Sequence, residues 1–263
     1  MNMTLRRCLP AVLAVASALA GCDGQLTPQA VELLEAGKED YRGGQHRSAV
    51  EKLDAFLEEH SRSDRADEAC YYRGLARYGL GDLSGAAADF EAAIDRADNP
   101  EVAIGARVAR GDVAYERSNL DLAAEMYRAA LEDIERGQKP EDHARYRLGC
   151  VLQRQGKWLE ADVEFDRVIY LFPDTDLAER AADRVRGRAW TVQAGAYTDR
   201  KLADRAAREL RSAGLPAQTR SELKAGRPLF VVSVGRFPTY EEAATSLEGV
   251  RSRRADAFVT TTR

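Results

Sequence analysis

The 263-residue sequence is poor in the side chains on which enzymes and metal sites depend. It has three histidines, His46, His60 and His143, and four cysteines. The cysteines show none of the paired spacings typical of zinc sites. No phosphate-binding glycine loop, no Gly-x-Ser-x-Gly turn and no His-Glu-x-x-His sequence occurs. We therefore expect a protein without enzymatic activity, without a cofactor and without a bound metal.

The sequence also has no apolar run long enough to span a bilayer, which takes about 20 residues. Its N-terminus instead has Arg6 and Arg7, a short apolar stretch over residues 9–20, and then Leu19-Ala-Gly-Cys22. This order is typical of a secretory signal. The last four of these residues resemble the bacterial lipobox.

The lipobox resemblance implies that residues 1–21 are removed, that Cys22 becomes the lipidated first residue, and that residues 22–28 form a membrane tether. Acyl chains contribute about 0.8 kcal/mol per buried CH₂, so several of them anchor a protein stably. The alternative is an ordinary signal peptide that ends at a chance cysteine. The expected location is the bacterial cell envelope, facing the periplasm. Asp23 leaves the choice between inner and outer membrane undecided.

The net charge of −4 is unevenly distributed along the chain. Residues 190–263 carry 13 Lys and Arg against 8 Asp and Glu, whereas residues 22–189 carry 24 against 35. A basic C-terminal part favours an anionic ligand, but a surplus of this size also serves solubility alone. The charge leaves both possibilities open.

Four glycines recur at nearly constant spacing: Gly37, Gly74, Gly111 and Gly149. Each is followed by a small and then a large apolar residue at fixed offsets, namely Ala49, Ala86, Ala123 and Ala161, then Leu53, Phe90, Tyr127 and Phe165. This pattern resembles tetratricopeptide (TPR) repeats, in which pairs of helices stack into a curved solenoid. Residues 29–188 are therefore expected to form an all-α solenoid, with residues 176–188 as a capping helix.

Tyrosines recur in the first helix of the expected repeats. Tyr41, Tyr78 and Tyr115 are spaced by 37 residues, with Tyr71 and Tyr146 nearby. On the concave face of a solenoid these rings would form a groove for an extended peptide or a partner helix, whose identity the sequence does not give. The alternative is that the rings stack between repeats and fill core space.

The C-terminal part alternates between strand and helix patterns. The expected elements are strands at 190–197, 216–222, 228–235 and 256–261, and helices at 199–213 and 239–252. Asp199 and Thr239 stand at the helix starts, where a side-chain oxygen can cap the first turn. The order βαββαβ predicts a four-stranded antiparallel sheet with two helices on one face and the other face open.

Two matching motifs lie in the first and third strands, Val192-Gln-Ala-Gly-Ala-Tyr197 and Val231-Val-Ser-Val-Gly-Arg-Phe237. They resemble the SPOR domain, a bacterial module whose family binds glycan strands of peptidoglycan, and the resemblance covers residues 189–263. It implies a multidomain protein in which the TPR solenoid is followed by a small α+β SPOR domain. The open sheet face would then hold peptidoglycan glycan, most readily glycan stripped of its stem peptides.

In the SPOR family, the glutamine of the first strand contacts the ligand, and here it is Gln193. With the open sheet face, the resemblance gives the candidate glycan-binding residues Gln193, Thr191, Ala196, Leu229, Val231, Ser233, Arg236 and Phe258. Three of them differ from the residues common in the family: Ala196 replaces serine, Val231 replaces arginine and Arg236 replaces proline. Four other aromatic residues are expected to pack in or at the edge of the core: Trp190, Tyr197, Phe230 and Phe237.

Two other classes of protein fit parts of the sequence. The βαββαβ order also describes RNA-recognition modules, but the basic and aromatic RNA motif is absent, so no nucleic-acid partner is expected. The second class is an envelope assembly scaffold, in which the repeats bind a protein partner and the SPOR-like domain is a structural appendage. The sequence favours glycan binding, with the repeats as a spacer or a scaffold and Cys22 as the membrane anchor.

Overall fold

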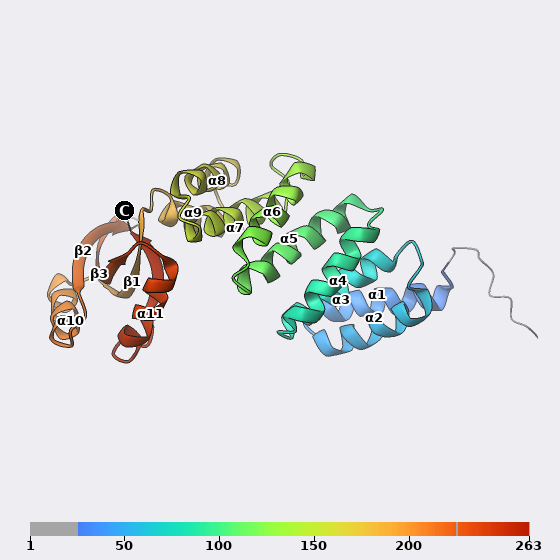
Figure 1. The fold of residues 1–263 in the computed structure, drawn as a ribbon, viewed down its shortest axis with the longest axis horizontal. Helices are drawn as coiled ribbons and strands as arrows, with labels where there is room; N and C mark the ends of the chain where they lie inside the picture. The colour runs from blue at the N-terminus through green and yellow to red at the C-terminus, as the bar shows by residue number, and fades with distance from the viewer. Residues whose placement is uncertain (1–25, 225, 263) are drawn as a thin grey trace, which may run out of the picture.

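The computed structural model describes residues 26–224 and 226–262, which form a row of helices followed by a small sheet domain (Figure 1). The expected signal sequence and Cys22 lie outside the described residues, so both the signal and the lipid anchor stay predictions. In the described part of the chain, none of the helices combines the length and the apolar character that a bilayer crossing requires.

In the described residues, the helical part consists of four helix pairs and a final single helix. The two helices of each pair pack together, and the first helices of consecutive pairs are also in contact. The elements are α1 (Pro28–Arg42), α2 (His46–His60), α3 (Ala66–Gly79), α4 (Leu83–Arg96), α5 (Pro100–Glu116), α6 (Leu120–Asp133), α7 (Glu141–Arg154), α8 (Trp158–Leu171) and α9 (Asp176–Arg184). The predicted solenoid with its capping helix is confirmed, although the cap ends at Arg184 and not at residue 188.

Side-chain caps fix where several of these helices begin. Asp82 accepts a hydrogen bond from the backbone of α4, Asn99 from that of α5, and Asn119 from that of α6. Thr27 and Thr175 cap α1 and α9 in the same way. Each cap satisfies an N–H group that has no partner within the helix, which stabilises the helix by about 1 kcal/mol.

The repeat glycines allow the two helices of each pair to cross closely. A Cβ atom on Gly111 would lie 2.7 Å from Cε1 of Tyr127, closer than real Cβ contacts occur. The same clash would arise between Gly37 and Leu53, Gly74 and Phe90, and Gly149 and Phe165. The large residue predicted from the spacing therefore packs directly on the glycine in every repeat.

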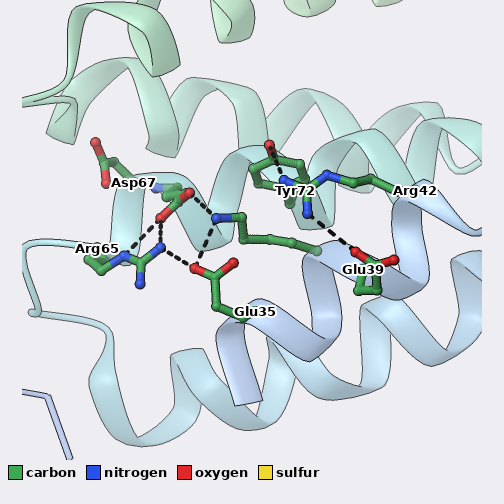
Figure 2. Close-up of polar contacts among 8 residues, drawn as sticks. Glu35, Glu39, Arg42, Arg65, Asp67 and Tyr72 are labelled. Atoms are coloured by element: carbon green, nitrogen blue, oxygen red, sulfur yellow. Dashed lines mark hydrogen bonds and ion pairs between the residues drawn. The ribbon is translucent and has the colours of Figure 1, made fainter. Parts of the chain in front are cut away.

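A buried lysine joins the first two repeats. Figure 2 shows the polar contacts around Glu35 and Arg65 at this interface. Lys38 of α1 is 7% exposed, and its ammonium donates to Glu35 at 3.0 Å and to Glu68 of α3. Arg65 donates to the same two carboxylates. Burial alone would lower the pKa of Lys38, but Glu68 and Glu35 outweigh it and raise this pKa. The lysine therefore remains charged inside the interface between α1 and α3.

The C-terminal domain has the predicted βαββαβ order. Its elements are β1 (Ala189–Tyr197), α10 (Arg200–Ser212), β2 (Ala217–Lys224), β3 (Arg227–Phe237), α11 (Tyr240–Arg251) and β4 (Phe258–Thr262). The strands form one sheet in the order β2-β3-β1-β4, and each neighbouring pair is antiparallel. Asp199 and Thr239 cap α10 and α11, as predicted.

Both helices of this domain cover the same face of the sheet. Val192, Ala194, Val232 and Val234 of the sheet form one buried cluster with Leu210 of α10 and Val250 of α11. Tyr197, Phe230 and Phe237 pack against this cluster, which confirms their predicted role in the core. On the opposite face of the sheet, the described residues of the C-terminal domain place no helix.

The repeats and the sheet domain meet at an aromatic cluster. Trp190 of β1 is 2% exposed and lies between Trp158 of α8 and Tyr240 of α11, with ring centroids 5.7 and 5.1 Å away. The guanidinium of Arg154 in α7 lies over the Tyr240 ring at 4.6 Å, and that of Arg184 lies over Trp190 at 5.7 Å. Trp190 is thus a contact between domains as well as a buried residue.

The short linker after α9 is held at both of its ends by one carboxylate. Asp162 of α8 accepts a hydrogen bond from the backbone N–H of Arg186 at 2.7 Å and from the guanidinium of Arg188 at 2.7 Å. Arg186 has a φ of +63°, a conformation that is strained for a residue with a side chain. The bond to Asp162 offsets this strain, so the linker is a fixed turn and not a flexible tether.

Candidate functional site: a cleft on the open sheet face

The helix-free face of the sheet is hollowed into a cleft of about 270 Å³. Side chains from all four strands and from α9 line it. They are Thr191, Gln193 and Ala196 of β1, Arg220 and Glu222 of β2, Leu229, Val231 and Ser233 of β3, Phe258, Thr260 and Thr261 of β4, and Asp183 of α9. Seven of the eight residues predicted from the sequence are therefore brought together, and Arg236 is the exception.

The strand register places three different chemical groups beside one another. Gln193 on β1 lies opposite Ser233 on β3 and opposite Phe258 on β4. Directly opposite residues on neighbouring strands have Cβ atoms about 4.5–5.5 Å apart. The row offers an amide, a hydroxyl and an aromatic ring that is 47% exposed. Such a row can hydrogen-bond the polar groups of a sugar and cover its C–H face.

An irregularity in β1 turns Ala196 toward the cleft. The pairing of β1 with β3 shifts between Gln193 and Gly195, so that one extra residue stands on β1. Strict alternation would place Ala196 on the helix side with Ala194. The bulge places Ala196 on the other face of the sheet. Ala194 belongs to the core, whereas Ala196 lines the cleft. A bulge of this kind is invisible to a simple alternation pattern.

Thr191 forms the floor of the cleft and is committed to the fold. It is 1% exposed. Its hydroxyl donates to the carbonyl oxygens of Gly235 at 2.8 Å and of Val234 at 3.2 Å. The donor is therefore used within the sheet, and a binding role for this hydroxyl stays a prediction.

Sequence reasoning missed the contribution of β2. Arg220 and Glu222 lie opposite Val231 and Leu229 on the open face. Arg220 donates from Nη1 to the Thr262 hydroxyl on β4, so side chains of the two edge strands meet over the curved sheet. Alternation along β2 would have predicted this contribution. Ala217 faces the core, so residues 220 and 222 face the open side of the sheet. Asp183 is different, since it belongs to the solenoid and no pattern in the C-terminal part predicts it.

Comparison with known families identifies both parts of the chain. A family model described as the SPOR domain matches residues 186–261, which include the whole sheet. Models described as the tetratricopeptide repeat match residues 34–102, 73–143 and 143–175. The chain is a TPR-repeat protein with a SPOR domain. A SPOR domain points to peptidoglycan binding and TPR repeats point to protein interaction, and neither is a catalytic module.

Solved structures similar to this TPR–SPOR protein include MamA of AMB-1, with 21% identity, coverage of 58% of this chain and 78% of that chain, and a TM-score of 0.48. MamA 41-end from Desulfovibrio magneticus RS-1 has 18% identity, coverage of 60% and 92%, and a TM-score of 0.49. YrrB, described as a TPR protein with an unusual peptide-binding site, has 22% identity, coverage of 59% and 74%, and a TM-score of 0.48. Likenesses at this level carry no functional argument. None of the curated proteins matches the chain.

The basic surplus of the SPOR domain is not concentrated in its cleft. Arg236 is exposed at the end of β3 and does not line the cleft. Among the described residues, the guanidinium that lines it is that of Arg220, which stands with the carboxylates of Glu222 and Asp183. The charge of the cleft therefore gives no support to an anionic ligand and suits a ligand with hydrogen-bond donors.

The tyrosines of the TPR domain pack between helices. Tyr41 contacts the ring of Tyr72, Tyr72 contacts Tyr71, and Tyr146 lies against Phe165, all with ring centroids within 6 Å. Tyr115 lies under the guanidinium groups of Arg147 and Arg154, and Tyr78 packs at the edge of a buried cluster.

Burial raises the pKa of both Tyr71 and Tyr146 to about 12. These contacts favour the packing alternative, and a partner groove stays a prediction. Sequence reasoning had overlooked Tyr72.

A carboxylate at the centre of the TPR domain joins three helices. Asp112 of α5 accepts a hydrogen bond from the Tyr127 hydroxyl of α6 at 2.6 Å. It also lies 3.0 Å from Nε2 of His143 and 2.8 Å from Nε of Arg147, both on α7. Burial by itself would raise the pKa of Asp112, but these partners outweigh it and lower this pKa. The residue is therefore an ionised structural link between repeats.

Proposed function

We propose that this protein binds the glycan strands of peptidoglycan in the cleft on the open sheet face of its SPOR domain. The observation that carries the proposal is the row formed by Gln193, Ser233 and Phe258, which sets hydrogen-bonding groups beside an exposed ring. The ligand we propose for this row is a sugar chain stripped of its stem peptides, because without those peptides the sugar rings can lie directly against the row.

We further propose that the cleft is held near a membrane by the N-terminal part of the chain. Lipidation at Cys22 would tether the chain to a membrane of a bacterial envelope, facing the periplasm, and the TPR repeats would act as a spacer or as a scaffold for a protein partner. The support is the lipobox-like sequence at residues 19–22 and the fixed turn between the repeats and the SPOR domain.

The test is cosedimentation of the mature chain with purified sacculi, with and without amidase treatment to remove stem peptides. We expect the treated sacculi to bind more protein. Gln193→Ala removes one or two hydrogen bonds of about 1 kcal/mol each, so affinity falls about five- to thirtyfold. The matched control is Gln138→Ala, the same change in an exposed loop of the TPR domain, and it leaves binding unchanged.

A scaffold role for the repeats, with the SPOR domain as an appendage, is the second candidate function. It is favoured by three apolar side chains that are exposed on α8, Leu159 (73%), Val163 (49%) and Tyr170 (76%). This candidate predicts that neither kind of sacculus retains the protein. An absence of binding by the unsubstituted chain would replace glycan binding with the scaffold function.

A further inference from the structure

We infer that two copies of this protein associate through α8, with the two α8 helices antiparallel and related by a two-fold axis. The inference concerns the solenoid and does not depend on glycan binding by the sheet domain. It starts from the outer surface of α8. The inner side of this helix is buried through Ala161, Phe165 and Val168, and exposed apolar residues lie on the opposite side.

These exposed residues form a stripe with the spacing of a helix seam. The stripe consists of Leu159, Val163, Asp166 and Tyr170, at steps of four, three and four residues. At about 100° per residue, the four positions share one narrow strip of the helix. Leu159 is 73%, Val163 49% and Tyr170 76% exposed. Exposed apolar side chains at this spacing are typical of helices that pack against another helix.

The symmetry of the stripe favours a second copy of this chain as the occupant. With the two-fold axis at the centre of the stripe, Leu159 of each copy faces Tyr170 of the other, and Val163 faces Asp166. Val163, Tyr170 and Leu171 help to line a hollow of about 560 Å³ on this surface. The hollow offers space for the other copy's Leu159 beside the Tyr170 ring.

The charges beside the stripe are also self-complementary. Glu160 and Arg167 lie seven residues apart on the same flank of α8. Equal flanks meet in an antiparallel pair, so Glu160 of each copy lies near Arg167 of the other. Within one chain, Glu160 lies 3.9 Å from Arg128 and Arg167 lies 3.1 Å from Glu164. The side chains of Glu160 and Arg167 are 60% and 52% exposed, so these intrachain pairs contribute little and both charges remain open to a second partner.

Asp166 limits the strength of this association. A polar residue within a helix seam favours one register at a cost in stability. One helix pair also buries less than the roughly 1,600 Å² of a standard interface, so we expect a dissociation constant in the micromolar range. Asp166→Leu completes the apolar stripe and is expected to tighten the dimer about tenfold.

The dimer would carry two sheet domains. Trp158, in the first turn of α8, contacts Trp190 of the sheet domain. The first turns of two antiparallel helices lie at opposite ends of the pair, so the two sheet domains lie at opposite ends as well. Two clefts on one assembly would strengthen attachment to a polymeric ligand without any new contact.

Sedimentation velocity on the mature chain tests the inference, with Cys22→Ser so that no acyl chain is attached. Between about 1 and 100 μM, we expect the sedimentation coefficient to rise from that of a monomer to that of a dimer. Leu159→Ala removes an apolar contact twice in each dimer and is expected to weaken it about tenfold. Leu202→Ala is the control, because Leu202 is 55% exposed on α10, away from the stripe, and it should leave the dimer unchanged.

Charge reversal tests the antiparallel arrangement. Glu160→Arg and Arg167→Glu each set like charges opposite one another twice in the dimer, so each is expected to weaken it about tenfold. A mixture of these two variants restores opposite charges at both contacts and is expected to recover the original affinity. Glu51→Arg, an exposed charge reversal on α2, is the control and should have no effect. All of the altered side chains are exposed, so the melting temperature should not change.

Three results would overturn the inference. A chain that stays monomeric at every concentration would leave the stripe to a different protein. A dimer that Leu159→Ala does not weaken would be formed by another surface. Two charge variants that fail to recover the dimer when mixed would contradict the antiparallel pairing of α8. Sacculus binding is measured separately, so none of these results decides whether the sheet domain binds glycan.

Discussion

The indole rings of Trp158 and Trp190 lie 5.7 Å apart across the boundary between the TPR repeats and the SPOR domain. They are the two tryptophans of the chain, one on the last repeat and one on the first strand. Tyr240 and Arg154 extend this contact, because Arg154 lies between the rings of Tyr240 and Tyr115. The intrinsic tryptophan fluorescence of this protein therefore reports on the contact between its two domains.

Asp162→Ala should loosen the linker. The change removes the acceptor for both the Arg186 backbone and the Arg188 guanidinium, and charge-assisted bonds of this kind contribute about 1–2 kcal/mol. We expect trypsin to cleave the folded protein after Arg186 or Arg188 about fivefold faster. Tryptophan emission should shift to longer wavelength as Trp190 gains contact with water.

Asp166→Ala serves as the control for this experiment, since it removes an exposed carboxylate of α8 that does not contact the linker. Cleavage at the same rate in both variants and in the unsubstituted protein would contradict the role of Asp162 as the clamp.

Gly111→Ala should destabilise the TPR domain. Its Cβ atom would meet the buried Tyr127 ring, whose hydroxyl is held by Asp112, so the ring cannot move aside freely. Overpacking of this kind costs about 1–3 kcal/mol, which lowers the melting temperature by several degrees.

Gly249→Ala provides the opposite case. The position lies in α11, where the nearest atom to a new Cβ is Cδ2 of Leu215 at 3.8 Å. Alanine should stabilise the helix there by about 0.5–1 kcal/mol. Calorimetry measures the melting temperature of both variants, which should fall for Gly111→Ala and rise for Gly249→Ala. A neutral Gly111→Ala would mean that the helix crossing tolerates a methyl group.

Asp112→Asn should lower stability in a pH-dependent manner. The folded-state pKa of Asp112 lies below its unfolded value of about 3.9, so its contribution is complete above that value and is lost as the pH falls through the lower folded-state pKa. We expect a loss of about 2 kcal/mol at pH 7, and a smaller difference from the unsubstituted protein near pH 3. Urea unfolding at both pH values measures this difference in the free energy of unfolding.

Asp133→Asn is the matched control, because Asp133 pairs with Arg107 at a half-exposed position. Surface pairs contribute about 0–1 kcal/mol, so this variant should remain close to the unsubstituted protein at both pH values. A constant deficit in Asp112→Asn from pH 7 to pH 3 would argue against an ionised Asp112.

The order of elements followed from the sequence because it depends on local signals. The glycine at the start of each repeat and the large residue after it proved to be in contact, and Asp199 and Thr239 proved to be caps. These signals act within one helix pair or one helix turn. The strand and helix boundaries differed from the prediction by no more than a few residues.

The cleft was only partly predictable, because its details depend on contacts between distant segments. Gln193 and Ser233 followed from alternation along two strands, whereas Ala196, which the bulge turns outward, was expected in the cleft only from the resemblance to the SPOR family. The bond from Arg220 to Thr262 depends on the curvature of the whole sheet. Asp183 could not be found from the C-terminal part at all, since it reaches the cleft from another domain.

The doubly held turn around Asp162 has a mechanical consequence. Because the connection does not act as a hinge, a force on the sheet is transmitted directly to the last helix pair. A sugar chain bound to the sheet would therefore fix the orientation of the entire solenoid, and with it the direction in which its concave surface faces.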